Sequence, residues 1–134
     1  MGKISYLEYS VRDFEYAKGN LSIGFYDPCG RFCQQSIEKR LKYYIEMHGT
    51  TDDLIILITH NLGKLYDRVC IISKTDQDLA IRGALSKLTD YYFDTNYPKD
   101  LNIELTQEMA QEAIEITETI NNWIDELLGA SDRP

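Results

Sequence analysis

Hydrophobic residues recur every three or four positions along most of this chain, which is the pattern of amphipathic helices. The clearest case lies in residues 28–49, where one apolar stripe runs through about six helical turns. Asp27 and Pro28 favour the start of that helix, and Gly49 favours its end because glycine tolerates the left-handed conformation beyond a helix. A stripe of this length needs partners, so we expect other helices to pack on it. The stripe comprises Cys29, Phe32, Cys33, Ser36, Ile37, Leu41, Tyr44 and Ile45.

The same spacing predicts further helices on both sides of this central one. A first helix spans residues 3–18, and a fourth spans about 77–93. The fifth follows Thr106, which can cap it, and ends at Gly129. The pattern therefore predicts an all-α, up-and-down helical bundle of four to five helices. We expect one domain over residues 1–134, with its core at about 5–128 and a tail at 129–134.

The third element is ambiguous, because the run LIILIT at residues 54–59 could form a short strand. We favour one continuous helix, because apolar residues continue at helical spacing well beyond the run. Thr50 and Thr51 can cap its start, and Thr59 could mark a break or kink. The apolar positions of this helix are Leu54, Ile58, Leu62, Leu65, Val69 and Ile72.

Charge changes the picture mainly at the end of the chain. The net charge is −8, and residues 101–134 hold eight acids and one base. This balance argues against a general nucleic-acid binder, and no DNA partner is expected. A local basic face on the central helix stays open, beside the simpler interpretation of a solvated helix flank. That face would comprise Arg31, Lys39, Arg40 and Lys42.

The same composition gives no sign of a membrane protein, a metal site or a cofactor. The longest apolar run, residues 54–58, is far too short to span a bilayer, and the N-terminus lacks a signal-peptide core. Cys29 and Cys33 lie four apart, as core residues of a helix do, and no pair of CxxC motifs suggests zinc. We expect a reduced, cytoplasmic protein.

Three segments, in this order, resemble the HEPN domain family. FCQQSIEKRLKYYIEMHG is similar to a family helix of the type QQ-x-x-EK-x-x-K, THNLGKL to T-H-[DN]-L-x-x-L, and LTDYYFDTNYPKD to a helix end followed by R-Y-P. The resemblance covers nearly the whole chain. It implies a helical bundle that often forms a symmetric homodimer and often pairs with a small nucleotidyltransferase, as toxin and antitoxin. Many members are ribonucleases, and others bind nucleotides or serve as interaction modules.

The chain departs from the family's nuclease motif, an Arg followed after four to six residues by a His. Arg40 precedes His48 by eight positions, and no Arg stands at the required distance before His60. Asn96 stands where the family often has the Arg of R-Y-P. Both differences remove a guanidinium that could hold a phosphate or a developing oxyanion. Arg31, Arg40 or Arg68 could supply it in space, as could a second subunit.

His60 is the candidate catalytic residue, because on a continuous helix it would point away from the apolar stripe; a surface histidine is the alternative. Lys39, Lys64, Asn96 and Tyr97 are the candidate ligand-binding residues. Glu38 and Lys39 could instead pair with neighbours on the helix surface. His48 reads as a favourable charge at a helix C-terminus. Tyrosines could stack on bases or fill core edges: Tyr43, Tyr44, Tyr91, Tyr92 and Tyr97.

Three functions follow from these observations. The first is a HEPN-like module that binds a partner protein, a nucleotidyltransferase, and a nucleotide or RNA, without an intact nuclease motif. The second is an active metal-independent ribonuclease toxin that uses His60 at a dimer interface. The third is a structural or regulatory helical dimer that docks through its acidic last helix.

Overall fold

The computed structural model describes residues 5–93 and 104–131, and every regular element in those ranges is a helix. The prediction of an all-α bundle is therefore confirmed. The elements are α1 (Tyr6–Ser22), α2 (Tyr26–His48), the 3₁₀ helix η1 (Thr51–Ile58), α3 (Leu62–Ser73), α4 (Leu79–Phe93) and α5 (Gln107–Ser131).

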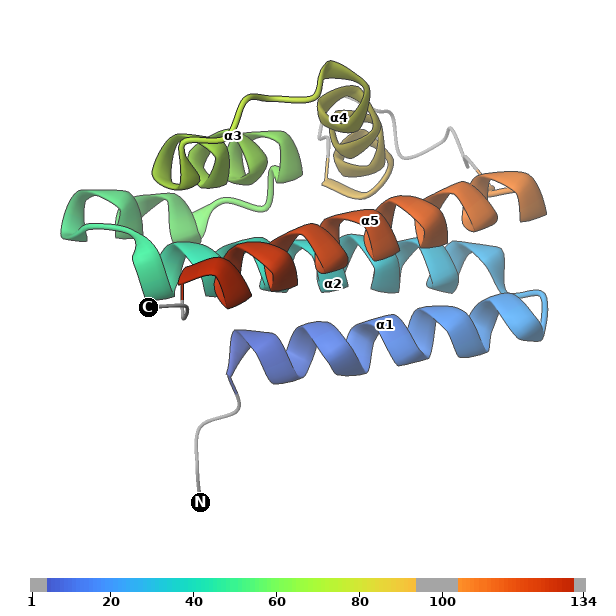
Figure 1. Cartoon of the computed structure of the whole chain (residues 1–134). Helices are drawn as coiled ribbons and strands as arrows, with labels where there is room; N and C mark the ends of the chain where they lie inside the picture. Colours follow the sequence, from blue (N-terminus) through green and yellow to red (C-terminus); the bar gives the residue numbers. More distant parts are fainter. Residues whose placement is uncertain (1–4, 94–103, 132–134) are drawn as a thin grey trace.

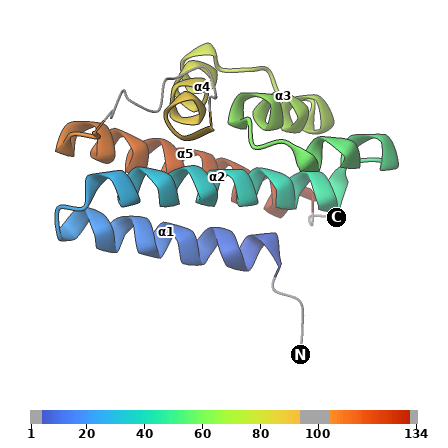
Figure 2. The same cartoon turned by 180° about the vertical axis from the view of Figure 1, so that it is seen from behind.

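The helices form layers, with α2 and α5 in the middle (Figures 1 and 2). Helix α1 covers one side of α2, and α3 and α4 lie on the opposite side of the α2–α5 layer. Helix α1 is antiparallel to α2, since Ser10 hydrogen-bonds to Ser36 while Tyr16 contacts Phe32. Helices α2 and α5 are parallel, because η1, α3 and α4 return the chain to the starting end of α2.

Helix α2 is buried on most of its circumference rather than along one stripe. The predicted stripe is confirmed, since Cys29, Cys33, Ile37, Leu41 and Ile45 have no exposed surface. Its charged flank is buried as well: Arg40 is 5 % exposed and Lys42 is 4 % exposed. The predictions of a basic face or a solvated flank are therefore wrong at these two positions, because α1, η1–α3 and α5 surround the helix.

The ends of α1, α2 and α5 differ from the predicted ends. Helix α1 continues through Gly19 to Ser22, and α5 continues past Gly129 to Ser131. Phe25, not Asp27, is the residue before α2. Asp27 lies in the first turn, and its carboxylate accepts a hydrogen bond from the backbone N–H of Leu105 (2.8 Å). Asp27 therefore holds the segment that leads into α5.

Gly49 ends α2, as predicted, but for a different reason. Its backbone is extended (φ −80°, ψ 162°) and not left-handed. A Cβ at this position would lie 2.6 Å from the Ile45 carbonyl oxygen and 2.9 Å from the Cβ of Asp53. Close packing of η1 against the end of α2 therefore requires glycine.

The predicted continuous third helix is interrupted. Thr50 and Asp53 cap η1 reciprocally, and Thr59 follows η1 in an extended conformation (φ −82°, ψ 151°). The Asn61 side chain then caps α3 by accepting a hydrogen bond from the Lys64 N–H (3.1 Å). The tighter 3₁₀ turn shifts the phase of the apolar positions. Ile58, predicted to be buried, is consequently 81 % exposed, and Leu54 is 40 % exposed.

The remaining core lies between α2, α3 and α5. Leu62, Leu65 and Val69 of α3 have no exposed surface, and Trp123 of α5 packs its ring against Tyr66. All three cysteines are buried and free, as a core role predicts. None of the helices in the described ranges is long and apolar enough to cross a membrane.

Replacing Gly49 with alanine should lower the free energy of unfolding by about 1–3 kcal/mol, because the new methyl group meets a backbone carbonyl that cannot move aside cheaply. Gly19→Ala is the matched control. Gly19 lies inside α1 with nothing within 4 Å of an added Cβ, so alanine should raise stability by up to about 1 kcal/mol. Urea unfolding of both variants measures the difference, and equal stabilities would contradict the packing argument.

Candidate functional site

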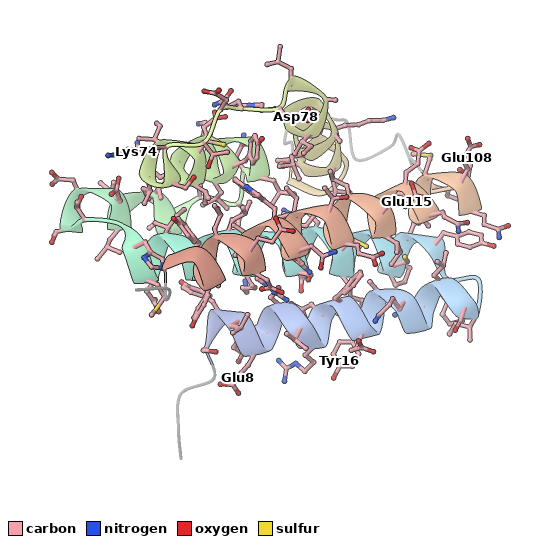
Figure 3. The ribbon with its side chains drawn as sticks, viewed as in Figure 1. Glu8, Tyr16, Lys74, Asp78, Glu108 and Glu115 are labelled. Atoms are coloured by element: carbon pink, nitrogen blue, oxygen red, sulfur yellow. The ribbon has the colours of Figure 1, made fainter. Side chains whose placement is uncertain are left out.

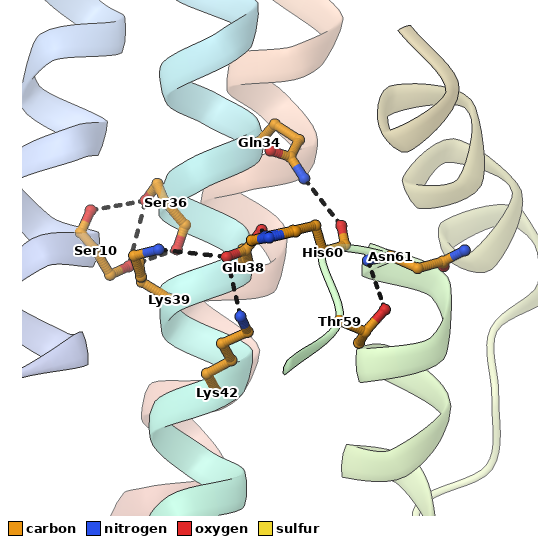
Figure 4. A network of polar contacts seen from close by, with 9 residues as sticks. All are labelled: Ser10, Gln34, Ser36, Glu38, Lys39, Lys42, Thr59, His60 and Asn61. Carbon is orange, nitrogen blue, oxygen red and sulfur yellow. Dashed lines mark hydrogen bonds and ion pairs between the residues drawn. The ribbon is translucent and has the colours of Figure 1, made fainter. Parts of the chain in front are cut away.

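Two of the family-like segments meet in one polar network, although they are far apart in the sequence (Figure 4). The Gln34 side-chain N–H donates to the backbone carbonyl of His60 (3.2 Å), and a Glu38 carboxylate oxygen lies 3.0 Å from His60 Nδ1. Helix α2 therefore holds both the backbone and the ring of His60.

Glu38 lies at the centre of this network. Its carboxylate is 2 % exposed and receives hydrogen bonds from Lys42 (3.1 Å) and Lys39 (3.3 Å) as well as contacting His60. Burial is the strongest single influence and acts to raise the pKa of Glu38, but Lys42, Lys39 and His60 together outweigh it. The pKa of Glu38 therefore lies below its usual value, and the buried carboxylate is ionised at neutral pH. The prediction of a surface pair is wrong for Glu38.

Asp13 of α1 approaches the same cluster from the other side of α2. It is 6 % exposed, and burial raises its pKa while the charges of Lys39 and Arg12 oppose that rise. The charge of Lys39 thus acts on two buried carboxyl groups. No motif singled out Asp13 in the sequence, because a lone acid in an amphipathic helix reads as a solvated residue.

The His60 side chain is presented to solvent by the break between η1 and α3. Its side chain is 59 % exposed, although the carboxylate that it contacts is buried. The expectation that His60 lies outside the core is confirmed, but the helical-phase reasoning behind it is wrong, because residues 59–61 are not helical. The Asn61 backbone N–H donates to the Thr59 hydroxyl (3.2 Å), which fixes the turn around His60.

The arginines that could complete a nuclease site are mostly held elsewhere. Arg40 donates to Ser10 (2.9 Å) and to Asp125 (2.6 Å), across the α1–α2–α5 contact. Arg68 pairs with Asp53 of η1 (3.2 Å). Arg31 is exposed near the start of α2. Neither Arg40 nor Arg68 donates a hydrogen bond to Glu38 or His60.

The other predicted site residues are only partly gathered. Lys39 belongs to the network, and Lys64 is exposed in the first turn of α3, just after the Asn61 cap. Asn96 and Tyr97 lie outside the described residues, as do the side chains of Tyr91 and Tyr92. Tyr44 is 4 % exposed, so it packs in the core rather than stacking on a ligand. The described residues contain no group of His, Cys, Asp and Glu that could hold a metal ion.

The network predicts that Glu38→Gln lowers the free energy of unfolding. The substitution leaves Lys42, which is 4 % exposed, without its counter-charge, and breaking a buried pair in this way costs about 3 kcal/mol. We expect a loss of this order in urea unfolding at pH 7. A loss below about 0.5 kcal/mol, typical of a solvated surface pair, would contradict the central role of Glu38.

Glu38 should also make stability depend on pH. Its folded pKa lies below the unfolded value of 4.5, so the unfolded chain binds more protons in that interval. The stabilisation is complete above about pH 4.5 and is lost as the pH falls through the folded pKa. Asp13 acts in the opposite direction. Its pKa is raised in the folded chain, so its contribution to stability falls as the pH rises. The difference in unfolding free energy between the wild type and Glu38→Gln should therefore shrink below pH 4.5, and a constant difference would contradict the assignment.

Comparison with known proteins agrees with the resemblance. The model of the HEPN domain family matches residues 5–127. No curated protein and no solved structure matches the chain. The match spans the described helices from α1 to most of α5 and includes the whole Glu38–His60 network. The chain belongs to the HEPN domain family.

Proposed function

We propose that this HEPN chain is a binding module without self-sufficient nuclease activity. It holds a phosphate-bearing ligand, a nucleotide or an RNA strand, beside His60, and it pairs with a partner protein. The observation that carries the proposal is an exposed imidazole fixed by a buried, ionised carboxylate, with neither Arg40 nor Arg68 donating to His60 or Glu38. Binding needs an oriented polar group, whereas cleavage also needs a second acid or base and charge stabilisation.

The surroundings of His60 favour a phosphate group as the ligand's contact. His60 directly precedes the Asn61 cap, so its ring lies at the start of α3. The N–H groups of Leu62 and Lys64 already donate to Thr89 and Asn61, so the attraction of this helix end for anions comes from the helix dipole. Lys64 adds a full positive charge in the same turn, and its side chain is exposed. Together these groups match one phosphate better than a neutral or cationic ligand.

A ribonuclease is the second candidate function, and the Glu38–His60 pair favours it. A proton on Nδ1 directed at Glu38 would leave Nε2 as the basic nitrogen of the neutral ring, which is the form that a general base requires. In this alternative a second subunit would supply the missing guanidinium. The two functions differ in whether RNA is cut without metal.

His60→Ala should weaken RNA binding about ten-fold, which is the loss expected for one charge-assisted hydrogen bond. Fluorescence anisotropy with a short labelled single-stranded RNA measures this at low salt. His48→Ala is the matched control, because His48 is also an exposed histidine but lies at the far end of α2. His60→Asn keeps a donor towards Glu38 while removing Nε2, and it should bind as poorly as His60→Ala.

The same preparations decide between the two functions. No cleavage in the presence of EDTA, with binding reduced only in the His60 variants, supports the binding module. Cleavage by the wild type that disappears in both His60 variants would establish the ribonuclease instead. Equal RNA affinities for His60→Asn, His48→Ala and the wild type would remove His60 from the ligand site.

The partner that we propose is a nucleotidyltransferase, on the ground of the HEPN family's usual pairing. The product of the gene beside this one is the natural candidate. Co-expression with an affinity tag on that product alone should retain this chain through size-exclusion chromatography. Separate elution of the two proteins at micromolar concentration would leave the chain without this partner.

A further inference from the structure

An apolar groove lies where α4 packs across the first half of α5. The hollow has a volume of about 70 Å³. Its floor and walls are hydrophobic, with Lys87 on the α4 side and Glu112 on the α5 side as the charged residues that line it. Leu88 and Ala113 are almost fully buried at its base. The remaining lining residues are Ala84, Leu105, Met109 and Ile116.

A row of carboxylates runs along α5 beside this groove, and one of them, Glu112, lines it. Glu112 lines both this groove and a second, wide hollow, which Glu108 and Glu115 also line. Glu108 and Glu115 project from α5 on the side away from α1 (Figure 3). These three glutamates are exposed, at spacings of four and three residues, which places them along one edge of the helix. None of them forms an ion pair within the described ranges of the chain, and α5 contains no Lys or Arg.

The negative charge beside the groove indicates which kind of molecule could bind in it. Three carboxylates against the single Lys87 leave this surface net negative, which disfavours RNA and anionic lipid. A second copy of the chain, placed with the same face on this one, would bring the same three glutamates against them. A small ligand would find few polar groups to fix its orientation. An apolar groove with an acidic edge instead complements a helix that has an apolar face and a basic flank.

We propose that the α4–α5 groove docks a basic amphipathic helix of a partner protein. Apolar side chains of that helix, at positions i, i+3 or i+4 and i+7, would seat against Leu88, Met109 and Ile116. Lysine or arginine side chains on its flank would meet Glu108, Glu112 and Glu115. This docking site gives a location to the partner binding proposed above and rests on that part of the proposed function. It does not involve the Glu38–His60 network, with which the groove shares no residue.

A designed peptide that carries the expected apolar face and basic flank tests the groove directly. The probe is a fluorescein-labelled helical peptide with leucine at every third or fourth position and lysine along one flank; a scrambled peptide of equal composition is its control. The full chain should bind the helical peptide and not the scrambled one at 0.15 M salt, where screening confines charge effects to about 8 Å. Ala84→Phe, which fills the hollow, and the double variant Glu112→Lys/Glu115→Lys should each raise the Kd at least about ten-fold.

Glu118→Lys is the matched control for charge. Glu118 is exposed on the same helix but lines neither hollow, so this change should alter the Kd less than about three-fold. If Glu118→Lys and the double variant lose the same peptide affinity, net charge alone explains the effect and the proposal is overturned. Binding that survives Ala84→Phe, or no binding to the wild type, would also overturn it, as would self-association of the chain that Ala84→Phe abolishes.

The outcomes separate the groove from the proposed function at His60. His60→Asn should leave peptide binding unchanged, and Ala84→Phe should leave RNA binding unchanged. If the tagged nucleotidyltransferase retains the wild type but not the double variant, the partner occupies the groove. If it retains both equally, the partner binds elsewhere, and the inference fails while partner binding stands.

Discussion

A carboxylate buried inside a helical bundle is the constraint on which the rest of this structure depends. Glu38 is 2 % exposed, and an unpaired ion at that depth would cost several kcal/mol. Lys42 and Lys39 come from the same helix, but His60 comes from the segment between η1 and α3. The requirement to satisfy one carboxylate therefore ties the third helical region to α2. It also fixes the position of the exposed histidine.

The same principle fixes the register of the other long helices. Arg40 is 5 % exposed and reaches Ser10 on α1 and Asp125 on α5. A shift of either helix by one turn would move its partner group by about 5.4 Å and break one of the two contacts of this buried guanidinium. Apolar packing tolerates such shifts more readily, since one aliphatic surface resembles the next. The polar contacts of α2 thus specify one arrangement among several that the hydrophobic core would permit.

Periodicity predicted the helices better than it predicted their surroundings. Apolar spacing located all five α-helices, and Thr106 caps α5 as predicted, whereas the Asn61 cap of α3 was not predicted. Spacing could not show that Glu38, Arg40 and Lys42 are buried, because a pattern rule assigns every charged residue to solvent. It also could not separate a 3₁₀ from an α-helix in residues 51–58, since both repeat at three to four positions. The meeting of Glu38 with His60 depended on tertiary contacts, although both residues lay in the family-like segments.

The His60 site and the α4–α5 groove differ in charge, and this difference has a consequence for how the chain could act. A phosphate ligand beside His60 and a basic helix in the groove require opposite electrostatic environments. Within about one Debye length, an acidic edge would weaken phosphate binding, and a bound polyanion would compete for the basic helix. The chain draws the two sites from different elements: α2 and the η1–α3 junction for one, α4 and α5 for the other. Binding at each site depends on the charges close to it and not on the net charge of −8. The acidic residues of α5 therefore need not oppose a phosphate ligand beside His60.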